Sequence, residues 1–193
     1  MSETLSVLIV GVGGQGVITA SEIVSEVVLN SGYDIKKSEI HGMSQRGGSV
    51  SSHIRFSKEK VYSPVAPKGS VDFMLSFEKM EGLRWIDHIK KDAVAIINDY
   101  RWDPLPVSSG KIEYTPEVNE KIKARRKAII YKATDLAAEI GNIRVTNIVL
   151  LGTLAKLLPI EKEKWLEVIK KKVPPKTIDL NIKAFEEGYK KES

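Results

Sequence analysis

The chain has 193 residues, of which 42% are hydrophobic and 28% are charged, close to the averages for soluble globular domains. This composition excludes a disordered, collagen-like or coiled-coil protein. No apolar run approaches the roughly 20 residues that a membrane-spanning helix needs, and no basic leader of the secretory type precedes the first apolar run. We therefore expect a cytoplasmic protein without a membrane partner.

Cysteine is absent, whereas 30 basic and 25 acidic residues give the chain a net charge of +5. Without cysteine, this chain has no disulfide, no thiolate nucleophile and no cysteine-ligated zinc ion or iron–sulfur cluster. The basic residues form no strong stripe, and the densest run, residues 121–127, is interpreted as a solvated helix face. Nucleic acid is therefore not an expected partner.

The start of the chain has the pattern of a strand, a turn, a helix and a second strand. Residues 5–10 are an apolar run of strand length, and glycines at positions 11, 13, 14 and 16 follow at once. Apolar residues then recur at helical spacing up to Gly32, and residues 34–40 have the length of a strand. We predict a βαβ unit here.

The next segment interrupts this pattern. The glycines within residues 41–48 exclude a regular element, and residues 49–56 then alternate between two kinds of side chain. This alternation predicts a half-exposed strand, which could form a hairpin arm toward residues 61–65. We therefore expect an antiparallel element at this point.

Strands and helices alternate in the rest of the chain. We predict strands at residues 71–77, 93–98 and 128–133, a helix at 79–91, and a loop at 99–115 that contains two prolines. A short helix that Thr134 and Asp135 could cap ends at Gly141, and helices at 142–158, 161–173 and 178–189 follow.

These elements predict a single α/β domain over residues 1–193. We expect a three-layer α/β/α, Rossmann-like fold, with C-terminal helices over residues 142–190 and a mostly parallel sheet that could include antiparallel strands.

The glycine-rich turn fits the dinucleotide-binding pattern G-x-G-x-x-G, and it lies between a predicted strand and a predicted helix. Such a turn lets backbone amides approach an anion at the helix N-terminus. An NAD site also needs an acid about 20 residues further on; Asp34 lies slightly early, and Glu39 is a credible candidate. Alternatively, the turn only lets the strand meet its helix closely. The candidate anion-binding residues are Gly11, Gly13, Gly14, Gln15 and Gly16.

A second polar constellation, HGMSQRGG, occupies residues 41–48. We expect this segment to lie beside the glycine turn, at the carboxyl ends of the strands. Arg46 offers a planar fork for a carboxylate or a phosphate, and it could equally pair with an acidic side chain of a partner subunit. The candidate ligand or interface residues are His41, Ser44, Gln45, Arg46, Gly47 and Gly48.

Catalytic and metal-binding sets are otherwise missing. The three histidines have no metal-ligand spacing, and neither a G-x-S-x-G elbow nor a Walker lysine motif occurs. The tryptophans at 85, 102 and 165 are interpreted as core or interface residues. We therefore assign no catalytic residue and no metal site to this chain alone.

Three segments carry a family resemblance: VGVGGQGV at residues 10–17, HGMSQRGGSVSSHIRF at 41–56 and NIVLLGTLAKLLP at 147–159. Together they resemble the gamma-type subunits of 2-oxoacid:ferredoxin oxidoreductases. The second segment and VPPKTIDLNIKAFEEGY at 173–189 are most similar to the beta subunits of the indolepyruvate-oxidising branch. The resemblance spans nearly the whole chain in the same order.

This resemblance implies a multi-subunit enzyme that oxidatively decarboxylates an aryl pyruvate, with coenzyme A as acyl acceptor and ferredoxin as electron acceptor. Thiamine diphosphate and 4Fe–4S clusters belong to the larger partner subunit in this family. The absence of cysteine, and of a GDG…NN thiamine diphosphate motif, agrees with this division. We expect no cofactor on this chain alone and no activity without the partner.

Within such a complex, we expect residues 41–48 to face the partner and the glycine turn to hold an anion, for which the phosphates of coenzyme A are one candidate. Two alternatives remain. A stand-alone NAD(P)-binding oxidoreductase would use the glycine turn and Glu39, and a basic nucleic-acid-binding module would use the positive charge.

Overall fold

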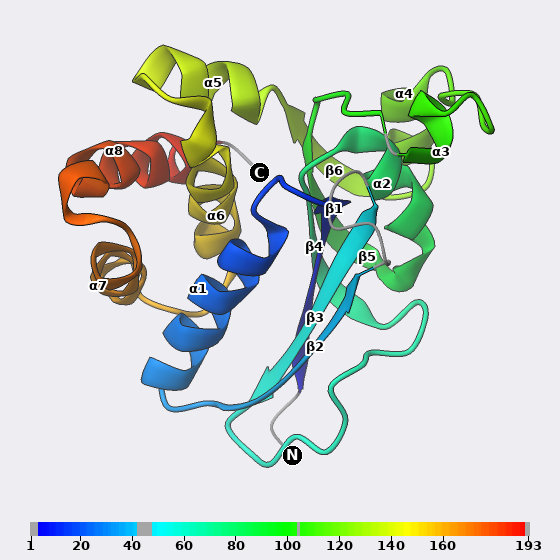
Figure 1. Ribbon diagram of the computed structural model, residues 1–193. Helices are drawn as coiled ribbons and strands as arrows, with labels where there is room; N and C mark the ends of the chain where they lie inside the picture. The colour runs from blue at the N-terminus through cyan, green and yellow to red at the C-terminus, as the bar shows by residue number, and fades with distance from the viewer. Residues whose placement is uncertain (1–3, 42–47, 104, 192–193) are drawn as a thin grey trace.

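The computed structural model describes residues 4–41, 48–103 and 105–191. They form one six-stranded sheet with helices on both faces (Figure 1). The sheet order is β2-β3-β1-β4-β5-β6; β1, β4, β5 and β6 pair in parallel, whereas β3 is antiparallel to both of its neighbours. The predicted three-layer fold, with a mixed but mainly parallel sheet, is confirmed.

The strands are β1 (Leu5–Val12), β2 (Asp34–His41), β3 (Ser49–Ser57), β4 (Val71–Ser76), β5 (Ile89–Asn98) and β6 (Lys127–Tyr131). The α-helices are α1 (Val17–Asn30), α2 (Lys79–Trp85), α3 (Leu105–Ser108), α4 (Val118–Lys123), α5 (Ala133–Ile140), α6 (Thr146–Leu157), α7 (Lys162–Lys172) and α8 (Ile178–Tyr189). Three short 3₁₀ helices are η1 (Ile86–His88), η2 (Ile143–Val145) and η3 (Pro175–Thr177).

The predicted βαβ unit is wrong in one respect: its two strands are not neighbours. The Cα partner of Ser52 is Ile9 on one side and Glu39 on the other, so β3 lies between β1 and β2. The crossover through α1 places β2 one strand away from β1, and β3 occupies the position between them. Since β3 is antiparallel to both, β1 and β2 still run in the same direction.

The prediction of a half-exposed strand at residues 49–56 is also wrong. Ser51 and His53 are 2% and 3% exposed, so β3 is buried on both faces. Residues 61–65 form no strand but belong to the loop between β3 and β4, where the Val61 amide donates to Asp34 Oδ2 at 2.6 Å. Because β3 pairs with β1 on one side and β2 on the other, it has no free edge for a hairpin with residues 61–65.

Several predicted boundaries shift, among them the start of the helix predicted at 142–158, which begins at Thr146 after η2. The helix predicted at 79–91 ends at Trp85, because η1 turns the chain into β5, which begins at Ile89. Ala133 starts α5 instead of ending a strand, and Lys132 rather than Thr134 precedes the helix as its N-cap. Within the predicted loop at 99–115 lies the single turn of α3.

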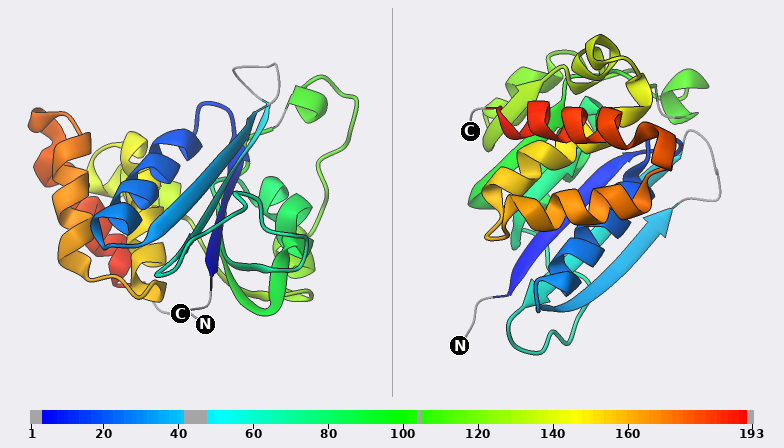
Figure 2. Two further views of the ribbon diagram at one scale, coloured as in Figure 1. Left: turned by 90° about the horizontal axis from the view of Figure 1, so that it is seen from below. Right: turned by 90° about the vertical axis from the view of Figure 1, so that its left-hand side faces the viewer.

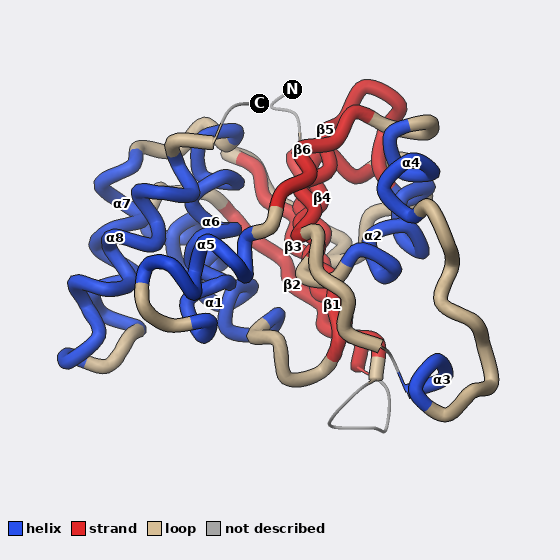
Figure 3. The backbone as a smooth tube through the Cα atoms, turned by 90° about the horizontal axis from the view of Figure 1, so that it is seen from above, coloured by secondary structure: helices blue, strands red, loops and turns tan. Residues whose placement is uncertain are grey.

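The helices divide the core into two clusters. Helices α1 and α5–α8 cover one face of the sheet, where Trp165 is fully buried, and α2 and α4 cover the other face (Figures 2 and 3). Trp165 is therefore a core residue as predicted, whereas Trp102 is 43% exposed. Among the described helices, none is long and apolar enough to cross a membrane.

Two glycines allow α6 and α8 to cross at close range. A Cβ atom on Gly152 would lie 2.1 Å from the Phe185 carbonyl oxygen, and one on Gly188 would lie 1.8 Å from the Val149 carbonyl oxygen. Thr153 Oγ1 also donates to the Gly188 carbonyl at 2.9 Å. The backbone itself is the contact surface, so a side chain at either glycine would force the helices apart.

We expect Gly152→Ala to lower the free energy of unfolding by about 3 kcal/mol, because overpacking against backbone cannot be relieved by a rotamer change. Urea unfolding measures this. Lys170→Ala, on an exposed position of α7, is the control and should change stability little. Equal stability of the wild type and Gly152→Ala would contradict the packing described here.

Candidate functional site

The glycine turn and the end of the second polar segment meet at one edge of the sheet. The Gly13 amide donates to the Gly48 carbonyl at 2.8 Å, and Val12 and Ser49 are Cα partners in the β1–β3 ladder. His41, at the end of β2, pairs with Val50. Gly48, the last residue of the second polar segment, therefore lies beside the glycine turn.

The candidate residues of the second polar segment, 41–48, are only partly described. Gly48 is placed as above, and the backbone of His41 ends β2. The His41 side chain and residues 42–47, which include Ser44, Gln45, Arg46 and Gly47, lie outside the described residues. Their roles stay predictions.

Two residues of the glycine turn serve packing and local structure. A Cβ atom on Gly11 would lie 2.9 Å from atoms of Gln15, Phe77 and Val17. At this position glycine therefore serves the close approach of strand and helix, which was the alternative to anion binding. Gln15 holds the turn: its Oε1 accepts from the Val12 amide at 2.8 Å, and its Nε2 donates to the Phe77 carbonyl at 3.3 Å.

The remaining part of the turn faces a cavity. Gly14 and Gly16 have φ values of 103° and 88°, which favour glycine. Helix α1 begins directly after Gly16 with no side-chain cap and no acidic residue in its first turn. Its first amides therefore keep their positive partial charge, which favours an anion.

The cavity has a volume of about 420 Å³. It lies between the starts of α1, α5 and α6 and the chain that follows β5. Sequence analysis missed most of its lining, because these residues come from segments that are distant in the chain. The lining residues are Gly14, Gln15, Gly16, Thr19, Phe77, Asn98, Tyr100, Trp102, Thr134, Ile143, Arg144, Thr146 and Asn147.

Asn98 fixes one wall of this cavity. Its Nδ2 donates to the Phe77 carbonyl at 3.0 Å and to Thr134 Oγ1 at 2.9 Å, and its Oδ1 accepts from the Thr134 amide at 3.3 Å. The side chain is 1% exposed. One buried amide thus joins the ends of β4 and β5 to the start of α5.

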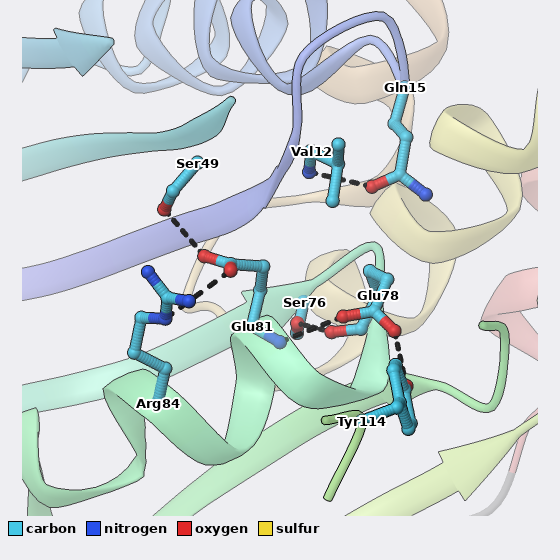
Figure 4. A network of polar contacts seen from close by, with 8 residues as sticks. All are labelled: Val12, Gln15, Ser49, Ser76, Glu78, Glu81, Arg84 and Tyr114. Carbon is cyan, nitrogen blue, oxygen red and sulfur yellow. Dashed lines mark hydrogen bonds and ion pairs between the residues drawn. The ribbon is translucent and has the colours of Figure 1, made fainter. Parts of the chain in front are cut away.

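Two buried carboxyl groups lie behind the same edge (Figure 4). Ser49 Oγ donates to Glu81 Oε2 at 2.5 Å, and Arg84 Nε lies 3.4 Å from Glu81 Oε1. Glu78 caps α2 by accepting from the Glu81 amide at 2.8 Å, and it also accepts from the Tyr114 hydroxyl at 2.5 Å. Glu81 therefore anchors Ser49, the first residue of β3.

Burial governs the ionisation of both groups. It raises the pKa of Glu78 and of Glu81 above the usual value, while hydrogen bonds from Tyr114 and Ser49 partly oppose the shift. No sequence pattern points to these two residues, because a glutamate early in a helix is normally solvated.

The two histidines whose side chains the structure describes, His53 and His88, pack against Trp85. His53 packs edge-on to Trp85 with ring centroids 5.9 Å apart, and burial and the charge of His88 lower the pKa of His53. In the part of the chain that the structure describes, no three acidic or histidine side chains are grouped as a metal site would require.

Glu39, the acid that the NAD(P)-binding alternative requires, is bonded to other side chains and lies away from the glycine turn. Glu39 Oε1 accepts from Ser21 Oγ at 2.9 Å and from Lys37 Nζ at 2.8 Å. It lies on β2, which β3 separates from the glycine turn on β1. The arrangement does not favour a ribose-binding role for Glu39.

The raised pKa of Glu81 has a consequence for stability. The folded protein holds this proton more tightly than the unfolded chain does, so the contribution to stability is complete in acid and is lost as the pH rises above about 4.3. In urea unfolding at a series of pH values, Glu81→Gln should therefore gain stability relative to the wild type as the pH rises.

Glu167→Gln, at an exposed position of α7, is the matched control and should follow the wild type. A stability difference between wild type and Glu81→Gln that does not change with pH would contradict the burial of an ionisable carboxyl group at position 81.

Both the family model and the similar sequences belong to oxidoreductases of the kind that the sequence resembles. The family model described as pyruvate ferredoxin/flavodoxin oxidoreductase matches residues 6–191. The chain is 42% identical over 192 residues to indolepyruvate oxidoreductase subunit IorB of Thermococcus kodakarensis, covering 96% of this chain and 94% of that protein. It is 40% identical, with the same coverage, to the subunit of that name from Pyrococcus horikoshii.

Solved structures have the same fold. The gamma subunit of a keto/oxoacid ferredoxin oxidoreductase from Geobacter sulfurreducens matches with a TM-score of 0.71 and 23% identity, over 96% of each chain. A 2-oxoglutarate:ferredoxin oxidoreductase from Magnetococcus marinus matches with a TM-score of 0.75 and 21% identity, over 98% of this chain and 31% of that one. The resemblance found in the sequence is confirmed: the chain belongs to the pyruvate ferredoxin/flavodoxin oxidoreductase family.

Proposed function

We propose that the chain is the small subunit of a 2-oxoacid:ferredoxin oxidoreductase that acts on indolepyruvate or a related aryl pyruvate. The observation that carries this proposal is the identity of 40–42%, over nearly the whole chain, to subunits named for indolepyruvate oxidoreductase. The absence of cysteine, which leaves the chain unable to ligate an iron–sulfur cluster, also supports it. A cytoplasmic location stays a prediction.

The proposal assigns the cofactors to a larger partner subunit. A chain without cysteine cannot ligate 4Fe–4S clusters, so electrons must pass to ferredoxin through another subunit. Thiamine diphosphate on that subunit would supply the carbanion stabilisation that decarboxylation needs. Coenzyme A would then accept the acyl group.

The chain's own residues would bind, orient and exclude water. Residues 41–48 would face the partner, where covering the reaction centre protects a reactive carbanion from protonation by water. The backbone around Gly14 and Gly16 and the uncapped start of α1 would hold a phosphate of coenzyme A. The Gly13–Gly48 hydrogen bond supports this division, because it keeps both segments at one edge.

Purification of the native complex tests the assignment. We expect this chain to elute with a large, cysteine-rich subunit that has iron–sulfur absorbance and contains thiamine diphosphate. The separated chain should be inactive, and recombination should restore ferredoxin reduction that depends on both indolepyruvate and coenzyme A. Turnover of an oxoacid by the chain alone, or tight binding of NAD(P) or flavin by it, would contradict the proposal.

Arg46→Ala tests the predicted anion contact. In the assembled complex the KM for coenzyme A should rise about tenfold to a hundredfold, the effect of losing one hydrogen bond to a charged group. Arg125→Ala is the control, since Arg125 is exposed and pairs with Asp87 at 3.5 Å, away from the glycine turn. Unchanged affinity and turnover in Arg46→Ala would remove Arg46 as a ligand; a failure to assemble would make it an interface residue instead.

A further inference from the structure

Strand β2 forms one edge of the sheet, and its outer side pairs with no other strand of the described residues (light blue in Figure 2). Its inner side pairs with β3 along its whole length, from Asp34 to His41. The loop after β3 reaches β2 at Asp34, whose Oδ2 accepts from the Val61 amide at 2.6 Å. An edge strand directs alternate backbone donors and acceptors outward, where another strand can pair with them. The segment 35–41 is therefore open to pairing.

A two-fold axis restricts how this edge can pair with the same edge of a second copy. In an antiparallel pair, opposite residues point to the same face of the sheet, whereas successive residues of one strand point to opposite faces. The axis must therefore lie between a residue and the same residue of the other copy. Ser38 is the middle residue of the open segment 35–41, so pairing centred on Ser38 uses that segment completely.

Charge distinguishes the possible registers. Lys37 and Glu39 point to the face that α1 covers, where Lys37 Nζ lies 2.8 Å from Glu39 Oε1 and Glu39 accepts from Ser21 of α1. Pairing centred on Ser38 sets each Lys37 opposite the Glu39 of the other copy, whereas a centre on residue 36, 37 or 39 sets like charges against each other. Opposite charges across a ladder stabilise it, and like charges destabilise it. Charges that keep a free edge from pairing with other strands thus make this one register specific.

Exposed apolar side chains flank this edge on both faces of the sheet. On the α1 face, Leu29 is 59% exposed and lines a groove together with Ile35 and Lys37. The two-fold axis would set the grooves of the two copies opposite each other. On the other face, Ile40 is 53% exposed and would lie opposite Lys36, whose aliphatic stem can cover it. Pairing would therefore remove apolar surface from water on both faces.

We propose that two copies of the chain pair through β2, in an antiparallel register centred on Ser38, and so form one continuous sheet. The cross-strand pairs of Lys37 with Glu39 fix the register, and the grooves beside α1 meet across the axis. The native enzyme would then contain this chain in pairs. This inference goes beyond the proposed function and does not depend on it, because it uses neither the glycine turn nor a larger subunit.

Disulfide cross-linking of the full-length protein tests the register. The chain contains no cysteine, so a single introduced cysteine can pair only with the same position of another copy. Ser38→Cys would lie opposite itself at the Cα separation of antiparallel partners, about 4.5–5.5 Å, which a disulfide can span. We expect oxidation to give a covalent dimer. Ile40→Cys is on the same face, but this register separates it from its copy by about 13 Å along the strand, so it should stay uncross-linked.

Charge reversal tests the cross-strand pairs, with sedimentation equilibrium measuring the dissociation constant of the dimer and circular dichroism confirming that each variant is folded. Lys37→Glu should raise the dissociation constant about tenfold, because it sets two carboxylates against each other at both pairs. The double variant Lys37→Glu/Glu39→Lys restores opposite charges and should recover most of the affinity. Lys123→Glu makes the same change of charge at an exposed position of α4, away from β2, and should leave the dimer unchanged.

Two results would overturn the inference. The first is a chain that sediments as a monomer when purified and occurs only once in the native complex; slow exchange of the β2 amides in that complex would then assign the edge to the larger subunit. The second is a dimer that Lys37→Glu does not weaken and Ser38→Cys does not cross-link. A chain that dimerises through β2 but never purifies with a large subunit would refute the proposed function and keep this inference.

Discussion

The hydrogen bond from the Gly13 amide to the Gly48 carbonyl joins two segments that the chain brings together only by inserting β3 between β1 and β2. The antiparallel ladders on both sides of β3 fix its register along its length, from Ser49 at the glycine turn to Ser57. Because of this arrangement, the end of the second polar segment lies beside the glycine turn and cannot shift without breaking two ladders. The rest of the edge, from Glu81 behind it to the cavity beside it, depends on this placement.

This edge of the sheet is held by buried hydrogen bonds and also presents positively charged groups that have no acidic partner among the described residues. The buried side chains of Asn98 and Glu78 satisfy backbone groups where strands end and helices begin, and buried Glu81 accepts from Ser49 Oγ at the start of β3. No side chain caps the start of α1, and the guanidinium of Arg144 makes no ion pair with a described residue. Under the proposed function, such a chain would hold an anionic ligand in place while the bond-breaking chemistry occurs on groups that a partner carries.

Local pattern was sufficient to predict most elements, because period and glycine placement are properties of short segments. It predicted β1, the turn and α1, and it identified α8 with its observed bounds. It also placed Gly48 beside the glycine turn, while the rest of that segment's placement stays a prediction. The insertion of β3 could not be predicted, since strand order depends on long-range pairing, and the alternation in residues 49–56 is typical of an exposed strand even though β3 is buried. Trp102 and Arg144 were missed for a related reason: only the fold brings them to Gly16.

Hydrogen exchange in the assembled enzyme tests most directly whether this edge is the working surface of the chain. The account predicts that the backbone amides from Gly14 to Thr19 exchange more slowly in the complex than in the separated chain, and more slowly still when coenzyme A is added, while the amides of the exposed face of α7 do not change. Protection confined to α7 and α8, with unchanged exchange at the glycine turn, would contradict it.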